Sequence, residues 1–257
     1  MNADDTSPLM DDIVEREREF HNNRFSQDSD PREFLDKWYR TIKNGADAQD
    51  EQVIRLSKNA DVMEYGCSDG GLSIDQLRLP RFAKSLSGID ISDVAIAKAN
   101  DKARLQGHKN STFYAMDAQN MTFKAESFDL VFGRGIIHHL DLDLCYADVC
   151  RVLRPGGRAV FYEPMGHNPV LNLYRARTPE IRTPDEHPLL VADFKLAKKY
   201  FSGVSVTYFG LATVLSAVVP GTAGRVGLQL GHAADAVLLN IPFIRRFAWY
   251  ALITLQK

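Results

Sequence analysis

The sequence has few cysteines, no strong excess of either charge and no targeting segment. Cys67, Cys145 and Cys150 cannot all pair, and none shows the CxxC spacing of a zinc site. They favour a reducing compartment over a disulfide scaffold. The net charge of −2 gives no basic surface for nucleic acid. The acidic, polar N-terminus does not resemble a signal peptide. We therefore expect a cytoplasmic protein that does not bind nucleic acid.

Charge is also missing from residues 200–224, and two shorter uncharged stretches follow Arg225 and Asp235. A transmembrane helix needs about 20 consecutive apolar residues, whereas Gly203 and Pro220 interrupt this run. Three interpretations remain open. The segment could form a buried strand and core helix, an apolar lid over a greasy substrate, or a surface that contacts a bilayer. Peripheral membrane association is therefore left open beside the cytoplasmic location.

From residue 61 onward, apolar strand-like segments alternate with amphipathic helical ones. This alternation predicts a mainly parallel sheet with right-handed crossovers, and ligands bind such sheets beyond the carboxyl ends of the strands. The fold class is therefore α/β, Rossmann-like and doubly wound. The predicted strands are 61–65, 85–90, 112–116, 128–132, 158–163 and 204–209, and the predicted helices are 12–20, 49–58, 72–78, 92–106, 141–153 and 189–200.

We divide the chain into four parts. Residues 1–48 are expected to form an N-terminal helical cover, with one helix opened by Pro31. Residues 49–165 form the α/β core. Residues 166–203 form a lid or substrate loop followed by a helix, because a long loop in a compact domain is often functional. Residues 204–257 supply the last strands and apolar helices.

The first strand runs into a glycine-rich turn, Glu64-Tyr-Gly-Cys-Ser-Asp-Gly-Gly71, which precedes a helix. Gly66 and Gly70, with Cys67 and Ser68 between them, let the backbone approach a ligand closely. The carboxylate of Glu64 is placed to hold an ammonium group. This spacing suits S-adenosyl-L-methionine (SAM) better than a dinucleotide, because the central glycine of the dinucleotide fingerprint is replaced by Ser68.

Acidic residues follow the next two predicted strands. Asp90 lies twenty positions after Gly70, where a carboxylate can accept both hydroxyls of a ribose. Asp117 could accept from an adenine amine, while Ile91 and Met116 pack on the ring beside Ala118. The alternative for both acids is a helix cap or turn role. After the fourth strand, the exposed carbonyls of Gly133-Arg134 would face the methionine ammonium of the cofactor.

Five motifs occur in order and at regular intervals over about residues 50–165: VMEYGCSDGG, GIDIS, AMDA, FDLVFGRGIIHHL and RVLRPGGRAVFYEP. Together they resemble class I SAM-dependent methyltransferases, especially the small-molecule group that includes ubiquinone, menaquinone and natural-product methyltransferases. The resemblance implies SAM as cofactor and a seven-stranded sheet whose last strand, 247–255, is antiparallel. Ser68 departs from the family's usual glycine. The resemblance implies cofactor-binding roles for Glu64, Gly66, Gly70, Asp90, Asp117 and Gly133.

Methyl transfer from a sulfonium needs a positioned nucleophile and, for a hydroxyl acceptor, a base. Imidazoles titrate near neutrality and suit that task. His138 and His139 follow the fourth strand, although either could instead cap or pack the next helix. Glu163 ends the fifth strand and could bind a substrate hydroxyl or amine, or serve only a structural role. The candidate catalytic residues are His138, His139, His167, His187 and Glu163.

We expect no metal, because adjacent histidines should point apart and Asp141 and Asp143 suit a helix start. The N-terminal aromatic residues Phe20, Phe25, Trp38 and Tyr39, with the uncharged C-terminal half, suggest a small lipophilic acceptor. O-methylation is favoured. C- or N-methylation and a non-catalytic SAM-binding role remain alternatives.

Overall fold

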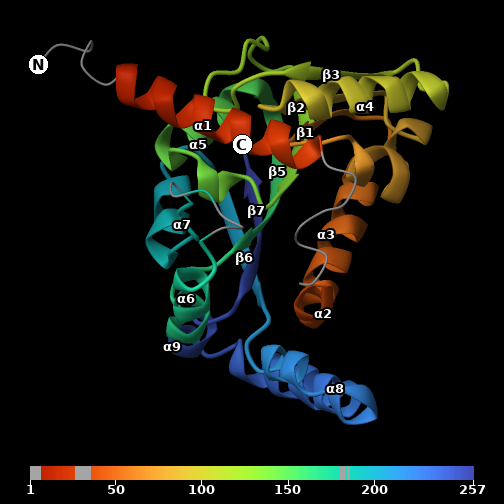
Figure 1. The fold of residues 1–257 in the computed structure, drawn as a ribbon. Helices are drawn as coiled ribbons and strands as arrows, with labels where there is room; N and C mark the ends of the chain where they lie inside the picture. The colour runs from red at the N-terminus through yellow and green to blue at the C-terminus, as the bar shows by residue number, and fades with distance from the viewer. Residues whose placement is uncertain (1–6, 27–35, 180–182, 184–185) are drawn as a thin grey trace, which may run out of the picture.

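The computed structural model describes residues 7–26, 36–179, 183 and 186–257. A single sheet forms its centre, and its strands alternate in sequence with helices (Figure 1). The seven strands are β1 (Asp61–Tyr65), β2 (Ser85–Asp90), β3 (Ser111–Ala115), β4 (Phe128–Arg134), β5 (Leu153–Pro164), β6 (Gly203–Phe209) and β7 (Tyr250–Gln256).

The strand order is β3-β2-β1-β4-β5-β7-β6. The first five strands are parallel, and β7 runs antiparallel to both β5 and β6. The order reverses between β1 and β4, which places the ligand-binding crevice beyond the ends of these two strands. This topology confirms the predicted Rossmann-like, doubly wound fold with an antiparallel last strand.

Helices cover both faces of the sheet. The α-helices are α1 (Ser7–Phe25), α2 (Asp36–Tyr39), α3 (Lys43–Leu56), α4 (Asp93–Leu105), α5 (Leu142–Val152), α6 (Pro169–Ala176), α7 (Val191–Ala197), α8 (Gly221–Leu238) and α9 (Pro242–Arg245). The shorter turns are η2 (Arg40–Ile42), the π-helical η3 (Gly71–Gln76), η4 (Leu79–Arg81), η5 (Ile137–His139) and η7 (Thr213–Val218).

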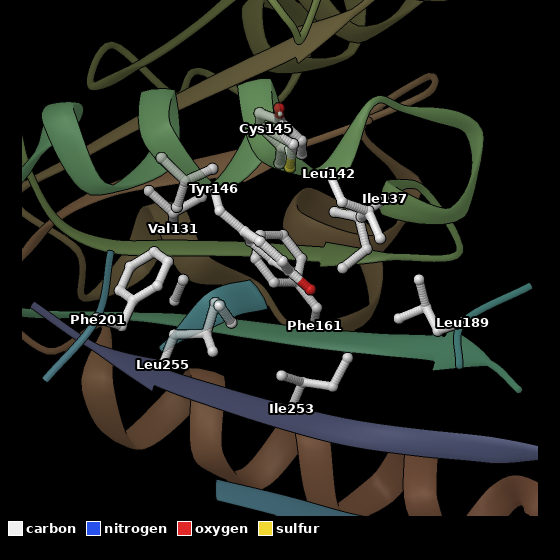
Figure 2. Close-up of a cluster of buried hydrophobic side chains, with 14 of the residues drawn as sticks. Val131, Ile137, Leu142, Cys145, Tyr146, Phe161, Leu189, Phe201, Ile253 and Leu255 are labelled. Atoms are coloured by element: carbon white, nitrogen blue, oxygen red, sulfur yellow. Dashed lines mark hydrogen bonds between the residues drawn. The ribbon is translucent and has the colours of Figure 1, made fainter. Parts of the chain in front are cut away.

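Two apolar clusters hold these layers together. In one, Tyr146 of α5 packs with Phe161 of β5 and Ile253 of β7, as Figure 2 shows. In the other, Val53 of α3 packs with strand residues such as Phe132 on the opposite face. All five side chains are fully buried, and each such burial contributes about 1.5–3 kcal/mol. A sheet that is covered on both faces needs strands with apolar side chains on both sides. Strand β1 fits this, because all five of its residues are buried and only Asp61 and Glu64 are acidic.

Three of the differences between the predicted and observed elements concern β5, the segment after the glycine-rich turn and the last strand. Strand β5 begins at Leu153 rather than residue 158, because Leu153 already pairs with Phe128 of β4; the register then shifts before Arg158 pairs with Leu130, and Gly156 in this interval has a left-handed φ of 77°. The segment predicted as an α-helix over 72–78 is the π-helical η3, which ends at Gln76 with Leu77 as its C-cap. Arg78 follows in the left-handed conformation at φ 54° and precedes η4. The predicted last strand starts three residues later, at Tyr250.

Two parts of the predicted organisation need comment. The predicted division between residues 48 and 49 falls within α3, so the cover and the core share that helix. The helix that Pro31 was expected to open begins outside the described residues. The predicted helix over 12–20 lies within the longer α1.

The uncharged segment folds into β6, η7 and α8. In the described parts of the chain, no helix has both the length and the apolar character needed to cross a membrane. The interpretation of a buried core helix is wrong for α8, whose buried residues are only Gly224, Gly231 and Asp235. Figure 1 shows α8 projecting from the lower end of the molecule, while α1 crosses the upper part.

Candidate active site

The turn after β1 approaches the end of β4 closely. Gly66 and Gly70 have left-handed φ values of 71° and 73°, and Ser68 shares this region at 50°. A Cβ on Gly66 would lie 2.8 Å from the Ile136 side chain, and one on Gly133 would lie 2.6 Å from the Tyr65 carbonyl oxygen. Side chains at these two glycines would therefore push the two strand ends apart and fill the space between them.

Asp90 joins this turn to the end of β2. Its carboxylate accepts a hydrogen bond from the backbone N–H of Ser68 at 2.8 Å and from that of Ser92 at 2.9 Å. Ser92 caps α4 by accepting from the N–H of Ala95 at 3.1 Å, as expected for an N-cap. A carboxylate oxygen has more than one lone pair, so Asp90 can still accept from a ligand in the cavity that it lines.

Glu64 lies beneath the turn and is 2% exposed. Its Oε2 atom has no hydrogen-bond partner among the described residues. Burial raises the pKa of this carboxyl to about 8. The positive charge of Arg134 lowers this pKa in part, whereas the negative charges of Asp90 and Asp69 raise it. A buried acid with an unsatisfied oxygen is suited to a cationic ligand, because a nearby positive charge favours the ionised form.

A cavity of about 440 Å³ lies above these residues. The residues proposed for the cofactor occupy one part of its wall, and histidines and aromatic rings occupy the rest. Asp117 lines it while accepting from the N–H of Gln119 at 2.8 Å. The predicted cofactor residues on the wall are Gly66, Ser68, Asp90, Ile91, Asp117, Ala118 and Arg134.

The other predicted cofactor residues do not line the cavity. Met116 packs against the apolar core instead of facing the site. Cys67 is buried in the second cluster, because its side chain lies beside Gly88. Glu64, Gly70 and Gly133 support the turn from behind. Arg134 reaches the wall but is held by Gln49 at 2.8 Å and by an ion pair with Asp50.

His138 and Glu163 form a buried pair at the cavity wall. The Nδ1 atom of His138 lies 2.8 Å from Oε2 of Glu163, and Oε1 accepts from the N–H groups of Ile136 and Ile137. A carboxylate can only accept, so Nδ1 carries the proton and the Nε2 lone pair of neutral His138 is left available. Burial and the adjacent His139 lower the pKa of His138. Glu163, which is fully buried and does not line the cavity, therefore positions His138 rather than binding substrate.

His139 connects the cavity wall to α1. Its Nδ1 atom lies 3.3 Å from Oγ1 of Thr183 and 3.6 Å from Oε1 of Glu17. Burial alone would raise the pKa of Glu17, but hydrogen bonds with His139 and His21 bring it well below its usual value. Glu17 is therefore ionised, and it holds α1 over the site.

Two predicted catalytic histidines lie away from the cavity. His167 accepts from the N–H of Val191 at 3.0 Å, so its ring faces the start of α7. His187 has an exposed ring, 3.5 Å from Asp193, and only its backbone N–H reaches the carbonyl of His138. Neither residue lines the cavity, so the structure gives no support to a catalytic role for either, and that role stays a prediction.

The two adjacent histidines do not point apart, as was expected when a metal site was argued against. The rings of His138 and His139 lie 4.2 Å apart, so adjacent histidines here point to the same region. With Glu186 they offer ligand atoms within 4.8 Å of one another. Asp141 caps α5 as expected, accepting from the N–H of Asp143 at 2.9 Å. The absence of a metal requirement stays a prediction.

Several cavity residues were not predicted. One face of α1 contributes Val14, Glu17, His21 and Arg24, whose spacing of three and four residues could have identified that face. Trp38 and Tyr39 line the cavity as predicted for the cover, whereas Phe20 and Phe25 do not. The remaining unpredicted wall residues include Gln119, Ile136, Leu140, Pro164, Val170, Leu171, Tyr174, Arg175, Glu186, Val214, Trp249 and Tyr250.

Comparisons with known proteins agree with this geometry. Residues 56–198 match the family described as "Methyltransferase domain". A sterol 4-C-methyltransferase of Caenorhabditis elegans is 28% identical over 44% of this chain and 33% of its own length. The aklanonic acid methyltransferase DauC of Streptomyces sp. is 30% identical over 50% of this chain and 56% of its own. The chain thus spans between a third and just over half of these curated relatives.

A solved structure extends the likeness of fold to nearly the whole chain. The geranyl diphosphate C-methyltransferase of Streptomyces coelicolor, in complex with Mg²⁺, geranyl diphosphate and S-adenosyl-L-homocysteine, superposes with a TM-score of 0.62. The match covers 95% of this chain and 98% of that one at 13% identity. At this identity the likeness concerns the fold.

Proposed function

The chain belongs to the methyltransferase-domain family, and on that basis we propose that it transfers a methyl group from SAM to a small lipophilic acceptor, with oxygen as the atom methylated. The matched segment covers more than half of the chain and includes both the glycine-rich turn and the His138–Glu163 pair. By their names, the relatives given above act on a sterol and on aklanonic acid, which supports a small-molecule acceptor.

The cofactor end of the cavity carries the features that SAM requires. Asp90 would accept from the ribose hydroxyls, and Asp117 from the adenine amine. The close approach of Gly66 and Gly133 leaves room for the methionine portion, and the unsatisfied carboxyl of Glu64 favours its ammonium group. When bound, SAM supplies an already activated methyl group.

The acceptor end combines one base with an apolar wall. His138, kept neutral by burial and oriented by Glu163, would take the proton of an acceptor hydroxyl at Nε2. Trp38, Tyr174 and Trp249 line the same cavity, and the rings of Trp38 and Tyr174 stack at 6.1 Å. These rings would bind an apolar acceptor and exclude water from the base.

The observation that carries the proposal is the placement of Asp90 and His138 on the wall of one cavity. We would measure SAM and S-adenosylhomocysteine affinity of the Asp90→Ala variant by calorimetry. Loss of a charge-assisted hydrogen bond costs about 1.5–3 kcal/mol, so affinity should fall roughly tenfold or more. The matched control is Asp101→Ala, an exposed acid of α4 outside the cavity. Unchanged affinity in Asp90→Ala would remove the cofactor assignment.

Carbon methylation is the second candidate, because aromatic rings crowd the acceptor end and can stabilise a cationic intermediate. The two chemistries differ in their need for a base. A panel of phenols, alcohols and polyprenyl alkenes, incubated with methyl-labelled SAM, would show which atom gains the label. Label on the oxygen of an acceptor, lost in the variant His138→Ala, supports O-methylation. Label on carbon refutes it, and no transfer to any acceptor, with SAM binding intact, favours a non-catalytic role.

A further inference from the structure

We propose that α6, η7, α8 and α9 form a docking surface for an anionic lipid bilayer at the mouth of the acceptor cavity. Thirteen large apolar side chains are exposed among the described residues, and nine of them lie on or beside these four elements. An apolar surface of this extent normally marks an interaction site.

Helix α8 is built to present one apolar row outward. Val226, Leu230 and Val237 recur at intervals of four and seven residues, so they fall within a sector of about 40°. Their exposed fractions are 49%, 68% and 66%. The opposite face carries Gly224 and Gly231, which let α8 approach η7 so closely that added Cβ atoms would clash.

The four elements are joined to one another and to the cavity. Asn168, the cap of α6, donates to the carbonyl of Phe247 next to α9 at 2.8 Å. Val214 of η7 lines the cavity, while the adjacent Leu215 is 71% exposed. Val170 of α6 both lines the cavity and is 72% exposed, so the apolar surface continues into the site. Figure 1 places α6, α8 and α9 at the same end of the molecule.

The charges of this surface identify its partner. Residues 211–249 contain Arg225, Arg245 and Arg246 but only one acid, Asp235. Asp235 is buried, because it accepts from the N–H of Ala212 and the hydroxyl of Thr213. No exposed acid in this segment therefore balances Arg225, which is exposed, or Arg245 and Arg246, which are half-buried. A basic rim around exposed apolar residues fits anionic headgroups above an acyl layer better than a neutral surface.

Such docking would let a membrane-dissolved acceptor pass from the bilayer into the cavity past Val170 and Leu215. The acceptor class rests on the proposed function, whereas the lipid contact does not. The test below contains neither SAM nor acceptor, so its result is independent of whether methyl transfer occurs.

The test is flotation of the full chain with phosphatidylcholine vesicles that contain or lack phosphatidylglycerol. We expect wild-type protein to float with the anionic vesicles, to bind the neutral ones at least tenfold less, and to be released by high salt. The variant Leu230→Gln/Val237→Gln should lose about tenfold in binding. The matched control Leu105→Gln/Leu144→Gln, which changes exposed leucines of α4 and α5, should float like wild type.

Thermal unfolding of both double variants should match wild type, because the altered side chains are exposed. Wild-type protein that stays at the bottom of the gradient would overturn the proposal, as would equal binding to neutral and anionic vesicles. A dimer in sedimentation velocity that the α8 variant abolishes, without flotation of the wild type, would assign the surface to a second copy of the chain and also overturn it.

Discussion

Binding of the cofactor should release a proton from Glu64. Burial raises the pKa of this carboxyl to about 8, so about 90% of it is protonated at pH 7 in the free protein. A methionine ammonium above the turn would favour the carboxylate and lower that pKa toward its ordinary range. Binding at pH 7 should therefore expel close to one proton.

The same linkage sets the pH dependence of affinity. When one proton leaves on binding, affinity rises about tenfold for each pH unit, or about 1.4 kcal/mol, until the pH reaches the pKa of the free protein. The effect should operate between about pH 6 and 8. The contribution of Glu64 to folding stability runs the opposite way: it is complete below the unfolded pKa and is lost as pH rises through 8, since the charged form is disfavoured in the fold.

The assay is calorimetric titration with S-adenosylhomocysteine, which carries the same ammonium group, in several buffers at pH 7. The slope of observed enthalpy against buffer ionisation enthalpy counts the protons released. Wild-type protein should give a slope near −1, since the buffer takes up the proton that the protein releases. Glu64→Gln, which cannot ionise, should give a slope near zero and show weaker pH dependence. A wild-type slope near zero, or equal slopes in both proteins, would refute the reasoning.

Three further predictions concern residues at the cavity wall or directly behind it. Glu163→Gln should lower kcat for a hydroxyl acceptor about 10²–10⁴-fold while leaving SAM affinity unchanged. The reason is that an amide donor beside His138 would move the ring proton from Nδ1 to Nε2. A higher KM for the acceptor with kcat unchanged would contradict this. In wild type, the acid limb of the kcat profile should lie below the ordinary histidine pKa, since burial lowers that of His138. Gly133→Ala should cost about 1–3 kcal/mol in chemical unfolding, because its Cβ meets a backbone oxygen at 2.6 Å. The control Gly227→Ala, which has space in α8, should stabilise by about 0.5–1 kcal/mol.

The sequence was sufficient to predict the α/β core, because local and global signals agree there. Strands β1 and β2 begin and end where predicted, since each is an apolar segment that runs into a glycine or an acidic turn. Strand alternation predicted that ligands bind beyond the carboxyl ends of the parallel strands, whereas the reversal between β1 and β4 came from the structure. Residues at the strand ends, such as Asp90 of β2, could therefore be proposed from the sequence.

The parts that depend on tertiary packing could not be predicted in the same way. Helix α1 is polar over most of its length, so the spacing of Glu17 and His21 marks one face of the helix but does not say that this face borders a cavity. His167 was expected to face the substrate because it follows β5. The chain instead turns after Met165, which forms a bridge with Leu189, and this turn directs the His167 ring to α7.

The exposed position of α8 could not be read from hydropathy either. An uncharged run is equally compatible with a core helix and with a surface one. The orientation of α8 is set by Gly224 and Gly231, which pack on η7. The opposite row of Val226, Leu230 and Val237 is therefore exposed. Small residues at a spacing of seven, opposite an apolar row, would be a useful sign in similar sequences.

The position of β7 has a consequence for how the chain reaches this state. It follows β6 in chain order, yet it lies between β5 and β6 and is the one strand among the described residues that pairs with β6. During synthesis, β6 must therefore wait without a pairing partner until residues 250–256 have emerged from the ribosome. Because β7 also pairs with Glu163 through Ala251, the strand that carries Glu163 gains this neighbour only after β7 has been synthesised, and nascent chains that stop before residue 250 should be substrates for chaperones or proteases.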